Sequence, residues 1–294
     1  MSTKILASTQ GDYIRLALTE DAKLVEYTLW NPDVPDGVGD LYTGRVAARA
    51  TAMGGVFVDL GAGQTGFLPD SAGGKSWSDG DLIGVRVTRA AQGGKGPRLA
   101  GDRSITPGHK AGLVAIGPGP LVDFHTQYPE SPIIVDSYAL LARLRNIVQN
   151  VVYGVHCLDP HEDEIAELES HNVMLPAGAR ATIIPTPALT AIDIDAGAST
   201  AERAHKSVSQ ARLNRTIIPE LARQIRLRNL GGAILIDFAG MRPAARASLA
   251  PELHRAFAGD PLRPRLLGFS CLGFAEIVRP RIRQPLHELL LRIR

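Results

Sequence analysis

The chain has 294 residues, of which 45% are hydrophobic and 21% are charged, and its formal net charge is +2. These totals place it among ordinary globular proteins with room for two or three modest domains, rather than among disordered or fibrous chains. Two cysteines without paired spacing, Cys157 and Cys271, indicate neither a disulfide framework nor a zinc site. No signal-peptide pattern and no apolar run near ~18 residues are present, so we expect a cytoplasmic protein without membrane contact.

The first 30 residues predict three strands, at 4–7, 13–18 and 23–30, separated by short polar turns. Alternating apolar residues and tight turns favour an antiparallel meander. A loop rich in Pro, Asp and Gly at 31–40 marks a boundary.

Residues 41–100 predict five short strands without space for a long helix, which is typical of a small closed barrel such as an OB-fold. Aromatic and basic side chains are interleaved in this stretch, a mixture that can stack unpaired bases and neutralise phosphates. The candidate RNA-binding residues are Tyr42, Arg45, Phe57, Phe67, Arg89, Lys95 and Arg98. The alternative for either phenylalanine is a place in the barrel core, and we expect that of one of the two.

From residue 107 the pattern returns to α/β alternation. We expect a strand at 131–136, an amphipathic helix at 137–150, a strand at 151–158 and an acidic helix at 159–170.

Two buried strands that each end in aspartate then follow, Thr190–Asp195 and Leu230–Asp237, with a basic helical segment from Glu202 onward between them. Pro219 is expected to kink that helix or to open a second one. If the strands are neighbours, Asp193 and Asp237 converge at one sheet edge and suit Mg²⁺, which prefers oxygen ligands. The alternative is that these aspartates only cap helices or begin loops.

Arginines gather in two places, at 212–228 and 276–294, where they outnumber the acidic residues. The guanidinium fork matches two phosphate oxygens, so these clusters suit phosphate recognition, with a solvated helix face as the alternative. The candidates for stabilising a phosphate are Arg223, Arg226, Arg228 and Arg279.

Several segments resemble the ribonuclease E/G family. Glu220–Phe238, which contains Leu-Gly-Gly-Ala-Ile-Leu-Ile-Asp, closely resembles that family's most recognisable segment. Leu189–Ile194 resembles the run with its first catalytic aspartate, and Gly273–Arg279 matches a strand near the end of its catalytic domain. The barrel motifs at 41–46, 55–61 and 66–69 are similar to its S1-type domain. The resemblance spans nearly the whole chain in collinear order.

The resemblance implies a mixed α/β fold of three parts. A ribonuclease H-like domain (1–38 plus 104–170) would be split by an S1-type OB-fold barrel (39–103), and a deoxyribonuclease I-like catalytic domain (171–294) would follow. It implies Mg²⁺, with Mn²⁺ possible, between Asp193 and Asp237. It also implies that the positions of Phe57, Phe67 and Lys95 hold single-stranded RNA.

The chain also departs from the family pattern. Asp195–Ala198 replaces the family's Asn-Ser-Ala-Arg run, so Asp195 becomes a candidate third carboxylate. Gly240 replaces the second acid of Asp-Phe-x-Asp-Met. No stretch has room for the pocket that senses a 5′-monophosphate, and the sequence ends before the family's zinc-link cysteines and small domain. We therefore expect no 5′-end sensing and no zinc, and a monomer or weak dimer instead of a zinc-linked tetramer.

The leading hypothesis is an Mg²⁺-dependent endoribonuclease for single-stranded RNA, with catalytic and metal-binding Asp193, Asp195 and Asp237. The first alternative is an RNA-binding protein that retains the nuclease scaffold with impaired catalysis. A metal nuclease or phosphatase with another substrate is the second, although it would leave the barrel without a role.

Overall fold

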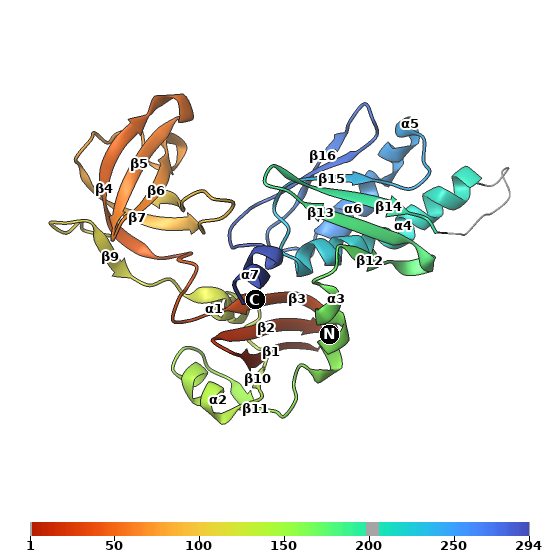
Figure 1. Cartoon of the computed structure of the whole chain (residues 1–294), viewed down its shortest axis with the longest axis horizontal. Coiled ribbons are helices and arrows are strands. Elements are labelled where there is room, and N and C mark those ends of the chain that lie inside the picture. The colour runs from red at the N-terminus through yellow and green to blue at the C-terminus, as the bar shows by residue number, and fades with distance from the viewer. Residues whose placement is uncertain (1, 198–205, 294) are drawn as a thin grey trace.

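The computed structural model describes residues 2–197 and 206–293, and its strands in these ranges form three sheets (Figure 1). Two are α/β sheets and one closes into a barrel, so the mixed α/β class and the OB-like barrel are both observed. No helix in the described ranges has the length and apolar content to cross a membrane.

The first sheet has the strand order β11-β10-β1-β2-β3. β1 (Thr3–Gln10), β2 (Tyr13–Glu20) and β3 (Lys23–Trp30) pair antiparallel, which confirms the predicted meander. β10 (Ile133–Val135) and β11 (Val151–Tyr153) extend it in parallel.

Alternation along the strands gives this first sheet two apolar faces. One packs against α1 (Gly119–Gln127) and α2 (Tyr138–Arg145). The other packs against residues near α3 (Glu162–Glu167) and against α7 (Leu286–Ile293).

Several elements of this half are shorter than the pattern predicts. β10 covers 133–135 of the expected 131–136, and β11 covers 151–153 of the expected 151–158. α2 begins after Ser137, whose hydroxyl accepts a hydrogen bond from the Leu140 amide at 3.1 Å, and it ends at Arg145 instead of 150. The acidic segment starts as a 3₁₀ turn, Asp159–His161, before α3. Short amphipathic helices are stabilised mainly by the face that packs against the rest of the protein. Few residues of these helices are packed in this way, so the helix ends fray.

The barrel consists of strands in the order β5-β6-β8-β7-β4-β9, and the additional pairing of β5 with β4 closes it. Its strands are β4 (Leu41–Ala50), β5 (Gly55–Gly61), β6 (Gln64–Pro69), β7 (Leu82–Arg89), β8 (Arg98–Gly101) and β9 (Gly112–Ala115). The sheet continues into β9, beyond the expected domain boundary at residue 103. Valine, leucine and isoleucine side chains fill the core.

The second α/β sheet has the order β12-β13-β14-β15-β17-β16. Its strands are β12 (Asn172–Met174), β13 (Arg180–Pro185), β14 (Leu189–Asp195), β15 (Gly232–Asp237), β16 (Arg265–Phe269) and β17 (Ala275–Arg279). α4 (Lys206–Leu227) and α6 (Ala250–Phe257) cover one face, and α5 (Pro243–Arg246) lies beyond the end of β15 (Figure 1).

α4 passes through Pro219 as one helix, so no second helix begins there. The expected helical residues 202–205 lie outside the described ranges. The apolar side of α4, which includes Ile217, Leu221 and Ile225, is buried against the sheet.

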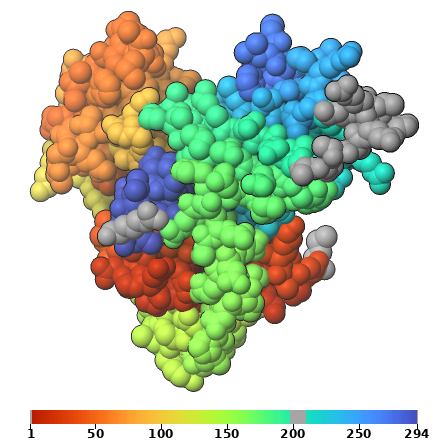
Figure 2. Space-filling model, turned by 45° about the vertical axis from the view of Figure 1, so that its right-hand side comes forward, coloured from red at the N-terminus to blue at the C-terminus, as the bar shows by residue number. Residues whose placement is uncertain are grey.

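The barrel joins the rest of the molecule through the segment after β17. The Ala90 amide donates to the Ile282 carbonyl at 2.7 Å, and the Gln284 side chain donates to the Ala91 carbonyl at 2.8 Å. The surface is hollowed between the barrel and the blue C-terminal part of the second sheet in Figure 2.

Candidate functional site

The two aspartate strands are neighbours. β14 and β15 run parallel, and their register places Asp193 directly beside Asp237. Ile192 and Ile236 point into the core, so the aspartates point to the opposite face of the sheet, away from α4 and α6, and Asp193 is exposed there. Adjacent strands lie about 4.8 Å apart, so the two carboxylates are side by side on one face.

Asp237 has a partner that the sequence pattern did not reveal. Arg246, at the end of α5, places its Nη1 atom 2.5 Å from Oδ1 of Asp237. The guanidinium is buried, and it also donates to the carbonyls of Met241 at 3.1 Å and Gly273 at 3.0 Å. The Asp237 side chain nevertheless remains 41% exposed, so the ion pair holds this carboxylate without burying it.

Asp195 lies on the same face two residues beyond Asp193, but its Oδ1 accepts a hydrogen bond from the Gly197 amide at 2.9 Å. Within residues 2–197 and 206–293, no three His, Cys, Asp or Glu side chains lie close enough together to hold a metal ion. The expected set of three carboxylates is thus not assembled there. A pair of carboxylates remains a suitable donor set for Mg²⁺, which commonly uses one or two carboxylates together with water and substrate phosphate.

The barrel brings three of its candidate RNA-binding residues together. Phe57 on β5 lies opposite Phe67 on β6, with ring centroids 5.5 Å apart at an angle of 61°, and Phe67 is in register with Arg98 on β8. Phe57 is 37% exposed and Phe67 is partly buried. Neither ring belongs to the barrel core, so the expectation that one of them would do so is wrong.

Among the other barrel candidates, Arg89 at the end of β7 is in register with Arg98. Tyr42 packs against the core, and its hydroxyl donates to Asp40 at 3.3 Å. Burial, together with the nearby Asp40 carboxylate, raises the pKa of Tyr42. Arg45 and Lys95 are exposed, and Arg45 donates to the Gly80 carbonyl at 3.3 Å.

The candidate phosphate-stabilising arginines lie away from the carboxylates. Gly232, at the start of β15, pairs with Arg279, and Asp237 is five residues further along the strand, roughly 16 Å at the usual rise. Arg226 and Arg228 lie near this same end of β15, because α4 ends at Leu227, shortly before the strand begins. This geometry gives the four arginines no contact with Asp193 or Asp237.

Instead, these arginines bind acidic and carbonyl groups of the chain. Arg279 is 2.7 Å from Asp260, and both side chains are buried. Arg226 pairs with Glu26 of β3, and Arg223 pairs with Glu164 at 2.5 Å and with Glu220 at 2.6 Å. Arg228 donates to Gln224 and to the carbonyls of Glu167 and Ser170. Burial, followed by the nearby charge of Arg223, lowers the pKa of Arg228 to about 10.

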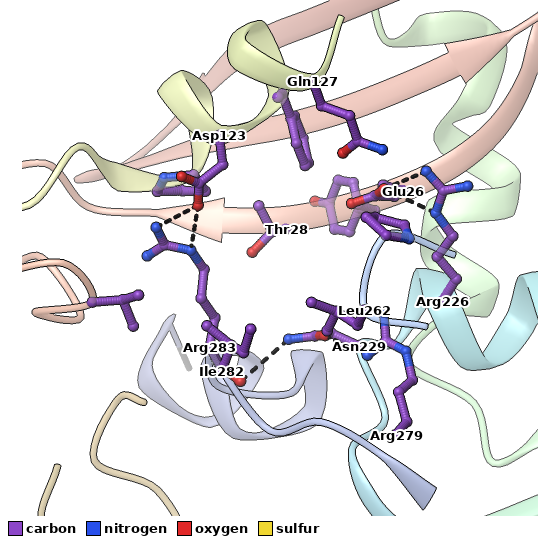
Figure 3. A pocket seen from close by; sticks show the side chains of 15 residues that line it. Glu26, Thr28, Asp123, Gln127, Arg226, Asn229, Leu262, Arg279, Ile282 and Arg283 are labelled. Carbon is purple, nitrogen blue, oxygen red and sulfur yellow. Dashed lines mark hydrogen bonds and ion pairs between the residues drawn. The ribbon is translucent and has the colours of Figure 1, made fainter. Parts of the chain in front are cut away.

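A cavity of about 390 Å³ lies between the first half and the end of the second sheet (Figure 3). Arg226 and Arg283 border it, paired with Glu26 and Asp123 respectively, and the pairs are drawn as dashed lines in Figure 3. Its charged groups therefore already neutralise one another.

Comparison with known proteins identifies the family of this chain. Residues 133–282, which are 150 of the 294, match the model of the Ribonuclease E/G family. Ribonuclease E of Synechocystis sp. is 32% identical over 175 residues, which cover 53% of this chain and 26% of that protein. Ribonuclease G of Escherichia coli K12 is 35% identical over 132 residues, covering 44% of this chain and 26% of that protein. The matched segments thus span about a quarter of these relatives. On the match to its model, this chain belongs to the ribonuclease E/G family.

Proposed function

We propose that this protein is an Mg²⁺-dependent endoribonuclease that cleaves single-stranded RNA without sensing a 5′-monophosphate. The observation that carries the proposal is the side-by-side placement of Asp193 and Asp237 on the solvent-facing side of two parallel strands. Both residues lie inside the segment that matches the family.

The donor set supports the metal part of the proposal. Asp193 and Asp237 would hold Mg²⁺, and Mn²⁺ accepts the same oxygen ligands. When bound, the ion would lower the pKa of a water molecule and neutralise negative charge on the phosphate. Asp195 would act through a bound water, because no three His, Cys, Asp or Glu side chains of the described residues lie close enough together to hold the ion directly.

The chain's own residues have separate roles in this proposal. Arg246 acts as a positioning residue, because it fixes one oxygen of Asp237 and is itself held by two backbone carbonyls. Phe57 and Phe67 would stack bases of the RNA, and basic side chains beside them would bind its backbone.

We also propose a fold type for each half of the protein, a cellular location and an oligomeric state. Five strands in the order β11-β10-β1-β2-β3, three of them antiparallel, support a ribonuclease H-like first half. The helix-covered second sheet supports a deoxyribonuclease I-like catalytic half. We further propose that the protein acts in the cytoplasm as a monomer or weak dimer, without zinc.

A second candidate is an RNA-binding protein with impaired catalysis. Two observations favour it: Gly240 stands where the family pattern has a second acid, and Arg246 occupies one oxygen of Asp237. The barrel would then bind RNA while the carboxylate pair remained idle.

Asparagine variants of the two aspartates separate these functions. Asp193→Asn is the cleaner variant, because Asp193 is exposed and forms no ion pair within the described residues. We expect Asp193→Asn and Asp237→Asn to lower cleavage of a fluorescent unstructured RNA below detection while changing RNA affinity little. Wild-type cleavage should require Mg²⁺ or Mn²⁺ and stop on chelation.

Asp12→Asn, in the exposed turn between β1 and β2, is the matched control and should retain full activity. An active Asp193→Asn protein would remove the metal assignment. A wild-type protein that binds RNA without cleaving it would establish the second candidate.

A further inference from the structure

Three arginines meet where the barrel joins the C-terminal segment. Arg89 ends β7, Arg98 begins β8 and Arg281 follows β17. The register of the barrel pairs Arg89 with Arg98. The hydrogen bond from Ala90 to Ile282 holds the residues after Arg89 and Arg281 together, so these two arginines flank one junction.

Arg281 is fixed in place by the glycine pair that precedes β15. Its Nε atom donates to the Gly231 carbonyl at 3.0 Å. A Cβ atom at Gly232 would lie only 2.3 Å from Nε and 2.4 Å from Nη2, so the guanidinium occupies space that any other residue would fill. The cation is therefore held in one orientation before any ligand arrives.

The part of the protein that the structure describes does not neutralise the positive charge of this cluster. Arg89, Arg98 and Arg281 form no ion pair within residues 2–197 and 206–293, although Glu288 borders a small pocket beside Arg281. The Nε atom of Arg89 is buried and has no hydrogen-bond partner. Burial, followed by the like charges of Arg98 and Arg281, lowers the pKa of Arg89. A bound anion would satisfy the donor and remove the repulsion.

The cluster is next to the aromatic pair of the barrel. Arg98 is in register with Phe67, which contacts Phe57. Single-stranded nucleic acid binds where a basic groove follows its backbone and aromatic rings stack its bases. A base stacked on the phenylalanines would bring a neighbouring phosphate toward the arginines, whose planar forks match two phosphate oxygens.

We propose that Arg89, Arg98 and Arg281 form a binding site for an internal phosphodiester of single-stranded RNA. The site spans the barrel and the catalytic half, so RNA bound there would bridge the two. This inference rests on the RNA-binding part of the function proposed above, and it does not depend on cleavage.

Arg281→Gln tests the site directly. We would measure the affinity of a fluorescent, unstructured oligoribonucleotide with a 5′-hydroxyl, in buffer without divalent ions, over a series of salt concentrations. Removing one charge-assisted hydrogen-bonding group should weaken binding about tenfold. The slope of log affinity against log salt should fall in magnitude by about 0.7 for each phosphate that the variant no longer neutralises. Arg281→Lys, which keeps the charge but not the fork, should retain the slope with weaker binding.

Arg145→Gln is the matched control, because it removes the same charge from an exposed position on α2. It should leave both affinity and slope unchanged. If wild-type protein binds RNA but Arg281→Gln matches wild type or Arg145→Gln, the site is refuted while the proposed function stands. An effect seen only with 5′-phosphorylated RNA would also overturn it, since the site would then read chain ends. Wild-type protein that fails to bind RNA at every salt concentration would overturn both proposals.

Discussion

Two groups of arginines in this molecule have opposite electrostatic surroundings. The first group lies between the first half and the second sheet, and each of its guanidiniums binds a carboxylate. It consists of Arg223, Arg226, Arg279 and Arg283. The second group, Arg89, Arg98 and Arg281, lies at the barrel junction and has no acidic partner within the described residues.

This contrast distinguishes a structural arginine from a ligand-binding one. A guanidinium that is already paired gains little from a phosphate, because the phosphate would have to displace a carboxylate. A guanidinium that is fixed in place without a carboxylate partner gains the whole charge-assisted hydrogen bond to the phosphate. The cavity of Figure 3 illustrates the first case, since its arginines are neutralised by Glu26, Asp123 and their neighbours.

Arg279→Met should have the largest effect on stability. Arg279 and Asp260 are 4% and 5% exposed, so removing the cation leaves a buried carboxylate without its partner. We expect the free energy of unfolding to fall by about 3–5 kcal/mol in urea titrations. The double variant Arg279→Met/Asp260→Asn should recover part of this loss, because the buried charge is gone.

Arg281→Gln, two residues further along, is the control for that experiment, and its free energy of unfolding should fall by only about 1 kcal/mol, because its Nε atom donates a single backbone hydrogen bond and no buried carboxylate loses a partner. Equal destabilisation by Arg279→Met and Arg281→Gln would mean that the two groups do not differ as described.

Phe57→Ala should have a smaller effect, and on RNA binding rather than on folding. The ring is 37% exposed and lies outside the barrel core, so its stacking on a base is the main interaction that the variant removes. RNA affinity should fall by about 1–3 kcal/mol, measured by fluorescence anisotropy. Tyr138→Ala, which removes an exposed ring from α2, is the control and should bind RNA normally. If Phe57→Ala binds RNA as tightly as wild type does, RNA binding by the unpaired arginines does not depend on base stacking at this ring.

The sequence predicted the strands well because their signal is local. Alternation identified the meander and the barrel strands, and two apolar runs ending in aspartate became the parallel neighbours β14 and β15. The short helices were harder. α7 escaped prediction because its partners lie in β3, more than 250 residues earlier, and burial of Leu286 and Leu289 against that strand is what stabilises it.

The site was predicted less completely, for a related reason. Composition shows that arginines cluster, but not which carboxylates they meet. Glu26 and Arg226 are 200 residues apart, and Asp36 and Arg283 are 247 apart. Arg246 is only nine residues from Asp237, yet the loop that returns it has no periodic pattern. The missing side chain at Gly232 makes room for Arg281, and no local pattern predicts that contact.

The smallest expected effect is on the pH dependence of stability, and it comes from Glu220, which pairs with Arg223 of the first arginine group. Burial alone would raise the pKa of Glu220, but hydrogen bonds from Arg223 and Gln224, with the charge of Arg223, bring it below its ordinary value of 4.5. The native state therefore binds this proton less readily than the unfolded chain does. The resulting stabilisation is complete above pH 4.5 and is lost as the pH falls through the lowered pKa of the native state.

Glu220→Gln removes that contribution. The difference in free energy of unfolding between wild type and Glu220→Gln should shrink as urea titrations move from neutral pH to below 4.5. Glu130→Gln, at an exposed position, is the matched control for loss of one acidic side chain, and its free energy of unfolding at neutral pH should stay within about 0.5 kcal/mol of wild type. A difference that stays constant with pH would mean that the carboxylate charge of Glu220 contributes nothing, and that the arginines of this interface are held by packing and neutral hydrogen bonds. The contrast with the unpaired arginines would then be one of burial rather than of charge.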